Sequence, residues 1–350
     1  MNPRGGIARK VAQLLCCALG LAGGAAVAAV TGAQPDLRST AQAAVPTREA
    51  VPVSVLGRPD MATPPEAPPV MRIEVSRTDP FGARFRDGMV VGGGTRHRLL
   101  LFTFDDGPDR HNTLRLLDYL DEAGVRAVFF LTASQMLGAN PRERLHQRIA
   151  KEIVRRGHLV GSHTLDHVQL PVLTDVEVRH QLRGAEEIFE QVLGARPWLL
   201  RPPGGSRSPR VDGIIAARGY TTLLWNVGTG DFQVRTPEEV LETWKRVLER
   251  READYGERGG IVLLHDTHEW SVEAFPRMIQ EIRDRNCRLL EENEELYDIV
   301  DDPSLFFAPR GDAEPTELAP LAEPDPSVLA ERQAGLRERT AMRCRRLAAN

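Results

Sequence analysis

The chain has 350 residues, of which 41% are hydrophobic and 27% are charged, so it can form one sizeable soluble domain with extensions. A formal net charge of −4 argues against a strongly basic surface, and we therefore expect no nucleic-acid partner. Four cysteines without a CxxC pair argue against a disulfide scaffold and a thiolate zinc site, and they leave open whether Cys287 and Cys344 pair.

The N-terminus has the features of an export signal. Arg4, Arg9 and Lys10 precede an uncharged run, residues 11–30, that is rich in Leu, Ala and Gly and is followed by small residues. This pattern is typical of a secretory signal peptide. The run is also long enough to span a bilayer, so residues 1–33 are either a cleaved signal or a membrane anchor. Either way we expect an exported protein, periplasmic, extracellular or anchored to the cytoplasmic membrane facing outward.

Composition divides the rest of the chain into three parts. Residues 34–94 are rich in Pro and Ala and predict a linker. Residues 95–300 are densely periodic and predict the working domain. Residues 301–350 are first acidic and Pro-rich, then Arg-rich. The final stretch from residue 328 could form a short helix, but we favour a flexible solvated tail.

Within the domain, short apolar runs alternate with amphipathic helical patterns. The runs predicted as buried strands are 98–104, 126–132, 158–163, 198–203, 221–227 and 259–265. The predicted helices are 113–124, 142–157, 175–194, 209–219, 237–252 and 271–286. Continuously apolar strands between helices indicate a parallel sheet covered on both faces. This many units in one domain favours a (β/α) barrel, in which chemistry takes place at the C-terminal strand ends.

Most of the predicted strands end beside an ionisable residue. These residues are Asp105 and Asp106 after the first strand, His163 after the third, Arg201 after the fourth, Asp231 after the fifth and His265 after the sixth. Buried ionisable groups are costly unless they are used or paired. We therefore expect these side chains to form one site.

Two of the motifs suggest a metal site. TFDDGP places Asp105 and Asp106 side by side, so that one carboxylate can hold a metal while the other acts on water. SHTLDH places His163 and His167 four residues apart, which on a helical turn brings both imidazoles to one face. Alone, the first motif also fits a plain turn and the second a pair of surface histidines. Together they supply three ligands and leave a position open for water, as in a catalytic zinc-type site.

Two further segments suggest charged groups around that metal. RPPGG supplies Arg201, whose guanidinium would keep Asp105 ionised and oriented, while rigid Pro203 and flexible Gly204 indicate a shaped loop close to a ligand. GDF supplies the carboxylate of Asp231, and IVLLHDTH supplies the imidazole of His265, and these two groups could pair.

Such a pairing would join Asp231 to His265. A carboxylate hydrogen-bonded to His265 would raise the pKa of that imidazole and suit it to donate a proton. We rank Asp266 and His268 below His265, because they lie further into the loop.

These segments resemble, in order, the five motifs of the NodB-like polysaccharide deacetylases, carbohydrate esterase family four. The matching segments are TFDDGP, HTLDH, RPPGG, GDF and LLH, within residues 98–300. The resemblance implies a distorted (β/α) barrel with about seven parallel strands and an active site at their C-terminal ends. It also implies a metal-dependent deacetylase acting on an acetylated polysaccharide, with zinc as the metal and cobalt or nickel as alternatives. Given the export signal, N-acetyl groups of GlcNAc-type residues in peptidoglycan fit best.

The resemblance also implies a role for each residue. Those roles are Asp105 as general base, Asp106, His163 and His167 as metal ligands, Arg201 as the residue that orients Asp105, Asp231 as the residue that tunes His265, His265 as general acid, the Gly204 N–H as oxyanion donor, and Leu263 as a wall for the acetyl methyl. Pro203 and Phe232 would complete the substrate pocket.

Four positions depart from the family pattern. Gly204 stands where a Tyr is frequent, Val168 where Pro is usual, Phe232 where Trp is usual and Asn226 where Asp is common. The catalytic set is intact, so these changes affect the substrate pocket. The sequence leaves open an O-acetyl esterase acting on a polysaccharide such as acetylxylan, and a non-catalytic carbohydrate-binding envelope protein on the same scaffold. It does not indicate an oligomeric state.

Overall fold

The computed structural model describes residues 79–307 and 317–348. The predicted signal or anchor and the predicted linker up to residue 78 lie outside the described residues. In the part of the chain that is described, no helix combines the length and the apolar character needed to cross a membrane.

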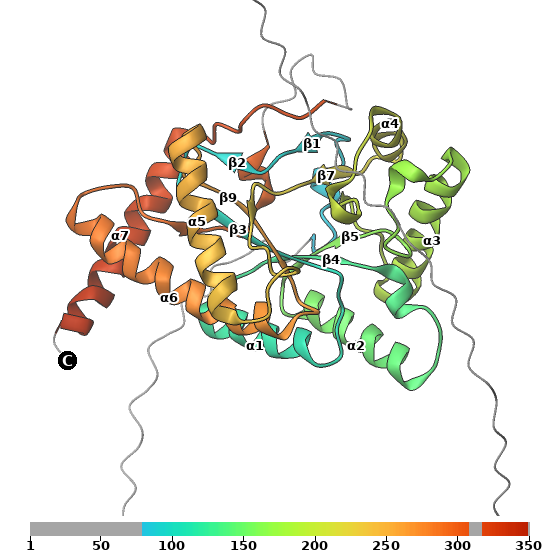
Figure 1. Ribbon diagram of the computed structural model, residues 1–350, viewed down its shortest axis with the longest axis horizontal. Helices are drawn as coiled ribbons and strands as arrows, with labels where there is room; N and C mark the ends of the chain where they lie inside the picture. Colours follow the sequence, from blue (N-terminus) through green and yellow to red (C-terminus); the bar gives the residue numbers. More distant parts are fainter. Residues whose placement is uncertain (1–78, 308–316, 349–350) are drawn as a thin grey trace, which may run out of the picture. The chain divides into compact units, whose positions relative to one another are not determined.

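Strands and helices alternate along the described chain (Figure 1). The strands are β1 (Val90–Val91), β2 (Gly94–Thr95), β3 (Leu99–Asp105), β4 (Val128–Leu131), β5 (Leu159–Ser162), β6 (Leu199–Leu200), β7 (Thr221–Leu223), β8 (Val227–Gly228), β9 (Gly259–His265) and β10 (Asp298–Ile299). The α-helices are α1 (Asn112–Ala123), α2 (Pro141–Arg155), α3 (Asp175–Leu193), α4 (Pro209–Ala217), α5 (Pro237–Tyr255), α6 (Glu269–Glu291) and α7 (Pro326–Ala348). Short 3-10 helices are η1 (Ala83–Phe85), η2 (Ala133–Met136), η3 (Leu170–Val172), η4 (Pro203–Gly205) and η5 (Pro303–Phe306).

The six predicted strands and six predicted helices are confirmed, with one change. The apolar run 221–227 is not one strand but two, β7 and β8, separated by three residues around Trp225. Helices α2 and α3 begin at capping boxes, in which Asn140 pairs with Glu143 and Thr174 pairs with Glu177. Each box satisfies backbone N–H groups that would otherwise lack partners, and so fixes where the helix begins.

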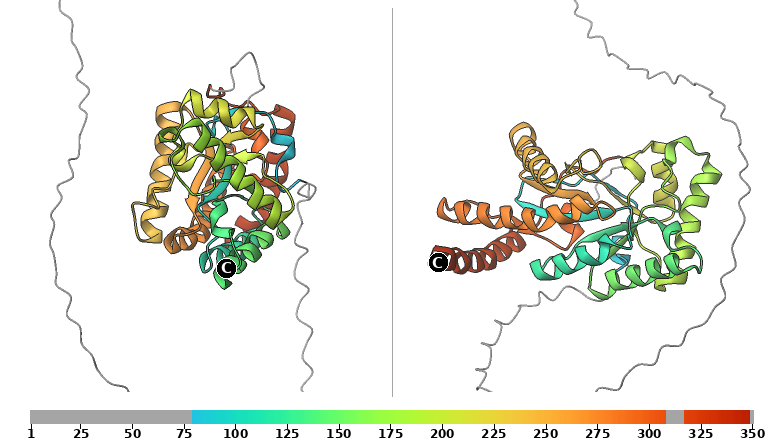
Figure 2. Two further views of the ribbon diagram at one scale, coloured as in Figure 1. Left: turned by 90° about the vertical axis from the view of Figure 1, so that its right-hand side faces the viewer. Right: turned by 60° about the horizontal axis from the view of Figure 1, so that its bottom comes forward.

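The strands form one curled sheet. Their order is β1-β7-β6-β5-β4-β3-β9-β2, with β10 beside β3 and β8 beside β9. Every pairing is parallel except that of β2 with β9. The two ends of this order, β1 and β2, are joined by Gly92 and Gly93 alone, so the sheet must bend back on itself. The helices lie around its outside (Figures 1 and 2), which confirms the distorted (β/α) barrel.

Alternation along β3 divides the core into two parts. Leu100, Phe102 and Phe104 pack outward against the surrounding helices, whereas Leu99 and Leu101 pack inside the curl of the sheet. Successive strand side chains point to opposite faces. The inward row of β3 therefore continues with Thr103 and then Asp105, so the interior changes from apolar to polar toward the C-terminal mouth of the barrel.

The folded domain begins earlier than the composition predicts. We expected a linker over residues 34–94, but residues 79–94 form η1, β1 and β2, and Phe85 and Val90 are 2% and 1% exposed. Strands of two residues have no detectable period in a sequence. Their pairing with β7 and β9 depends on the rest of the sheet, so composition alone places the boundary too late.

The C-terminal segment also differs from the expected flexible tail. Residues 326–348 form α7, which is joined to α6 by a disulfide between Cys287 and Cys344, with the two Cα atoms 5.9 Å apart. Arg332 Nε lies 2.6 Å from Asp298 Oδ2, and the Gln333 side chain forms two hydrogen bonds with the Leu296 backbone. These partners lie more than 30 positions away in the sequence. The composition of the Arg-rich segment alone therefore predicts a solvated tail, because it does not show them.

We predict that replacing both cysteines, Cys287→Ser with Cys344→Ser, lowers the free energy of unfolding by about 2–4 kcal/mol, because the bond closes a long loop in the unfolded chain. Urea unfolding with and without reductant measures this. Reductant should bring the wild type to the level of the variant and leave the variant unchanged. A wild type that is insensitive to reductant contradicts the prediction.

Candidate functional site

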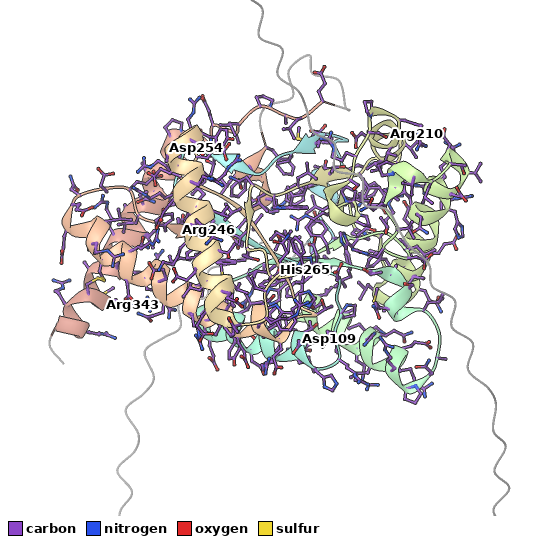
Figure 3. The ribbon with its side chains drawn as sticks, in the orientation of Figure 1. Asp109, Arg210, Arg246, Asp254, His265 and Arg343 are labelled. Atoms are coloured by element: carbon purple, nitrogen blue, oxygen red, sulfur yellow. A yellow bond between two sulfur atoms is a disulfide. The ribbon has the colours of Figure 1, made fainter. Side chains whose placement is uncertain are left out.

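The ionisable residues predicted at the strand ends meet at the C-terminal mouth of the barrel. Asp105 ends β3 and Asp106 follows it, His163 follows β5, Arg201 follows β6, Asp231 lies after β8 and His265 ends β9. In Figure 3, His265 lies among the strands near the centre of the view. The parallel sheet therefore brings to one edge residues that are up to 160 positions apart in the sequence.

Asp106, His163 and His167 form a cluster suited to a metal ion. Their potential ligand atoms all lie within 4.8 Å of one another. Asp106 Oδ1 is 3.3 Å from His163 Nε2 and 3.0 Å from His167 Nε2, and this buried oxygen accepts no hydrogen bond from the described residues. Burial opposes the charge of Asp106, but the two imidazoles outweigh that effect and hold the pKa of its carboxyl well below the usual range. Two imidazole nitrogens and a carboxylate oxygen are the donor set of a catalytic zinc site.

The two histidines meet through loop geometry and not through a helical turn. We expected the four-residue spacing to act on a helix, but residues 163–167 form a loop after β5, in which Thr164 has φ 71° and His167 has φ 59°. Asp106 also has a left-handed φ of 75°. Such values are uncommon for residues other than glycine and persist where the surroundings enforce them. The loop places the imidazole rings of His163 and His167 4.9 Å apart.

A backbone contact fixes the orientation of His163. Its Nδ1 lies 2.7 Å from the carbonyl oxygen of Arg201, and because a carbonyl only accepts, Nδ1–H is the donor. Nε2, the other ring nitrogen, therefore points toward Asp106. Nε2 and Asp106 Oδ1 lie 3.3 Å apart, and two acceptor atoms at that distance are stable only with a proton or a cation between them. The hydrogen bond from Nδ1 to the Arg201 carbonyl therefore orients the His163 ring for a metal.

Arg201 forms a fully buried ion pair with Asp105. Its Nη1 lies 2.8 Å from Asp105 Oδ1 and 2.8 Å from Thr103 Oγ1, and the remaining guanidinium nitrogens donate to the carbonyls of Leu223 and Leu224. Burial lowers the pKa of Arg201, while the Asp105 charge acts in the opposite direction. The pair lies inside the protein and not on its surface, since the Arg201 side chain is 0% exposed.

Asp231 and His265 form a second pair on the other side of the cluster. His265 Nδ1 lies 2.9 Å from Asp231 Oδ1, while Asp231 Oδ2 accepts from the His265 N–H and from the Ser271 hydroxyl. Burial disfavours the imidazolium, but the hydrogen bond and charge of Asp231 outweigh it and raise the pKa of His265 to about 9. His265 Nε2 is free to face the cluster, 4.0 Å from Asp106 Oδ2.

The remaining predicted residues lie around this mouth. Pro203 is buried, and Gly204 is exposed with a left-handed φ of 62°. Leu263 is buried on β9, two residues before His265. Phe232 is 55% exposed, and its ring centroid lies 6.3 Å from that of His265. An exposed aromatic side chain at a polar mouth offers a surface for a ligand.

The two residues ranked below His265 serve other contacts. Asp266 is fully buried and accepts a hydrogen bond from the Thr113 hydroxyl, and burial raises the pKa of its carboxyl to about 7. The ring of His268 stacks on Trp270 at 4.9 Å.

Sequence reasoning missed three residues that support the site. Thr103 donates to the Val262 carbonyl and accepts from Arg201, Ser271 donates to Asp231, and the Trp270 indole donates to the Asp231 carbonyl. Thr103 is one polar residue within an apolar strand, which is a weak signal for a buried partner. No local signal marks the other two, because both read as ordinary first-turn residues of a helix.

Comparisons with known proteins show which family the chain resembles. The family described as polysaccharide deacetylase matches residues 92–223. The chain is 31% identical over 213 residues to a chitin deacetylase of Colletotrichum lindemuthianum, covering 58% of this chain and 82% of that one. It is 29% identical over 192 residues to a peptidoglycan-N-acetylglucosamine deacetylase of Bacillus cereus, covering 54% of this chain and 64% of that one.

A solved structure shares the fold. The chitin deacetylase from Colletotrichum lindemuthianum superimposes with a TM-score of 0.52 at 27% identity, covering 62% of this chain and 94% of that one. With the family match and the similarity to the fungal enzyme over most of that enzyme's length, the chain belongs to the polysaccharide deacetylase family of hydrolases.

Proposed function

We propose that the protein is an exported, metal-dependent deacetylase that hydrolyses N-acetyl groups of GlcNAc-type residues in an envelope polysaccharide such as peptidoglycan. The observation that carries the proposal is the convergence of three side chains that could hold a metal ion, with potential ligand atoms within 4.8 Å of one another, beside the Asp105–Arg201 pair and the Asp231–His265 pair. That arrangement supplies ligands, a base and an acid around one point.

Asp106, His163 and His167 would hold the metal, and zinc fits their donor atoms best. The unpartnered buried oxygen of Asp106 and the fixed tautomer of His163 both support a cation at this position. When bound there, a divalent ion would lower the pKa of a water molecule and polarise the acetyl carbonyl.

Asp105 is the proposed general base. Arg201 occupies Asp105 Oδ1, whereas Oδ2 faces the ligand cluster at 3.8 Å from His163 Nε2. One oxygen therefore holds the side chain in position, and the other remains to take a proton from the attacking water. The Gly204 N–H would donate to the oxyanion that develops on the acetyl oxygen.

His265 is the proposed general acid. Departure of an amine from a tetrahedral carbon requires a proton on nitrogen, because an amide anion is a very poor leaving group. Asp231 holds Nδ1–H and keeps the imidazole protonated near neutral pH, so Nε2–H can deliver that proton.

Two observations favour an exported protein. The charged and apolar N-terminal pattern is typical of a signal or an anchor, and Cys287 and Cys344 form a disulfide, which persists in oxidising compartments. An exported deacetylase meets polymers of the envelope, and the named relatives act on chitin and on peptidoglycan N-acetylglucosamine.

We predict that Asp106→Ala abolishes stoichiometric metal binding, because it removes the only carboxylate of the ligand cluster. Elemental analysis of the purified protein measures this. Asp254→Ala, which removes an exposed carboxylate on α5, is the matched control and should retain the metal. Equal metal content in both variants would contradict the ligand assignment.

We predict that Asp105→Asn and His265→Ala each keep the metal but lower turnover by about 10²–10⁴-fold, the usual contribution of a general base or acid. Steady-state acetate release measures turnover, with metal content determined on the same samples. Wild-type rates in both variants would overturn the assignment of the base and the acid.

The substrate test compares acetate release from purified peptidoglycan, chitooligosaccharides and acetylated xylan. We expect release from the N-acetylated substrates, loss of that release with a chelator and recovery with added zinc. Release from acetylated xylan alone would replace the proposed substrate with an O-acetyl ester. Release that is unaffected by complete removal of the metal would contradict metal dependence.

A further inference from the structure

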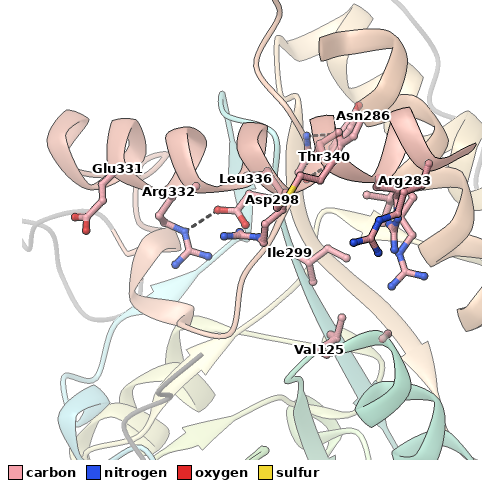
Figure 4. Close-up of a pocket in the computed structure, with 18 of the residues that line it drawn as sticks. Val125, Arg283, Asn286, Asp298, Ile299, Glu331, Arg332, Leu336 and Thr340 are labelled. Atoms are coloured by element: carbon pink, nitrogen blue, oxygen red, sulfur yellow. Dashed lines mark hydrogen bonds and ion pairs between the residues drawn. The ribbon is translucent and has the colours of Figure 1, made fainter. Parts of the chain in front are cut away.

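A cavity of about 840 Å³ lies between helices α6 and α7, the end of α1 and strand β10 (Figure 4). Its lining includes apolar side chains, such as Val125, Ile299 and Leu336, beside charged ones. The volume falls in the range of small-molecule sites, so the cavity is large enough for an organic ligand and not only for an ion.

This cavity is distinct from the candidate active site. Its β10 wall pairs with Leu99 and Leu100, the first residues of β3, whereas Asp105 ends that strand. At the usual rise per residue in a strand, the two ends of β3 are roughly 20 Å apart. In Figure 3, His265 lies near the centre of the view and Arg343 lies on α7 toward its left edge. The inference therefore does not depend on the proposed function.

Positive charge dominates the lining. Five arginines and only two acidic residues line the cavity, and one acid, Asp298, is already paired with Arg332 (Figure 4). The other arginines form no hydrogen bond or ion pair with any described residue. They are Arg283, Arg339, Arg343 and Arg346.

Arginines elsewhere on α6 have acidic partners. Arg277 pairs with Glu238, Arg285 pairs with Glu249 and Glu281, and Arg288 lies 4.0 Å from Glu281. Glu238 and Glu249 on α5 and Glu281 on α6 thus supply counter-charges along the other faces of α6. Only toward the cavity does it present a guanidinium without one.

Partial burial makes these unpaired charges costly. Arg283 and Arg343 are half-buried, and burial lowers the pKa of each guanidinium. The charge of Arg343 lowers the pKa of Arg283 further, while Asp284 acts on Arg343 in the opposite direction. Charges removed from water are expected to be paired. Within residues 79–307 and 317–348 neither guanidinium has a hydrogen-bonded or ion-paired partner, so an anion from outside would relieve the repulsion.

The disulfide holds the two helices that carry these arginines. Cys287 lies one helical turn after Arg283 on α6, and Cys344 is the residue after Arg343 on α7. The covalent bond therefore limits how far the two guanidinium-bearing segments can separate. A site whose charges are held together before binding loses less entropy when its ligand binds.

We propose that this cavity binds a phosphate group, either free or as part of an anionic phospholipid head group. Phosphate offers several acceptor oxygens to guanidiniums that come from two helices, and arginine pairs with it through short, charge-assisted hydrogen bonds. The apolar part of the lining would contact the organic portion of a phosphate ester.

The test uses the full-length, metal-loaded protein and the variant Arg283→Gln with Arg343→Gln. Calorimetric titration with inorganic phosphate at constant ionic strength forms one arm. Co-sedimentation with phosphatidylglycerol–phosphatidylcholine vesicles, compared with phosphatidylcholine alone, forms the other. We expect the double variant to bind at least about tenfold more weakly in the arm or arms where the wild type binds, because two charge-assisted contacts are lost.

The matched control is Arg288→Gln with Arg345→Gln. It changes the same two helices and the same net charge, but both residues are exposed and neither lines the cavity. Its affinity should stay within about twofold of the wild type, since distant exposed charges contribute little. The wild type and both double variants keep Asp106, His163 and His167 unchanged. Phosphate that binds at the metal would therefore contribute equally to all three affinities, and it does not explain a difference in affinity between the two double variants.

Thermal unfolding keeps the proposal falsifiable if affinity is difficult to measure. In chloride buffer the cavity variant should unfold at the wild-type temperature or higher, because repulsion is removed, and added phosphate should stabilise the wild type more than the variant. Binding of phosphate alone identifies a soluble ligand, and binding of vesicles alone identifies a lipid head group. A wild type that binds neither, or equal weakening in both double variants, overturns the proposal.

Discussion

The guanidinium of Arg201 has no access to water, so every one of its hydrogen bonds must end inside the protein. It binds the Asp105 carboxylate at the end of β3 and two backbone carbonyls at the end of β7, while its own carbonyl holds His163 after β5. One residue thereby fixes the proposed base and one metal ligand relative to each other. Loss of its charge would leave Asp105 buried without a partner, which is among the most costly changes a core can suffer.

At the second pair, the buried residue that holds its partner in position is an anion and not a cation. There a buried carboxylate, Asp231, organises the site by holding both the ring and the backbone N–H of His265, and it is held in turn by Ser271 and Trp270. A buried cation thus holds the Asp105 side chain in position, and a buried anion raises the pKa of His265. The proposed ligand cluster lies beside both, with Asp105 Oδ2 3.8 Å from His163 Nε2 and His265 Nε2 4.0 Å from Asp106 Oδ2.

Strand β3 connects two regions of different character. Its C-terminal end carries paired charges, in which each acid or base has a partner inside the protein. Beside its N-terminal end lies a cavity in which four of the five arginines lack such partners among the described residues, closed on one side by a helix that a disulfide holds in place. In barrels of this kind the N-terminal end usually contributes stability, so an unpaired charge there has no structural purpose that the fold itself explains.

The secondary-structure elements and the residue types of the candidate site could be predicted from the sequence. Six apolar runs, six amphipathic helices and the ionisable residues at the strand ends were all readable, because period and residue type are local properties. The loop conformation that joins His163 to His167, and the hydroxyls of Thr103 and Ser271, were not readable, because they depend on left-handed backbone angles and on partners from other strands.

The same distinction explains the two ends of the domain. β1, β2 and α7 have little pattern of their own and are held by pairing with distant strands or by a disulfide to α6. That Cys287 meets Cys344, and that five arginines line one cavity, is visible only in the folded chain. Such contacts depend on which distant segments the fold brings together. A local stretch of sequence does not contain that information.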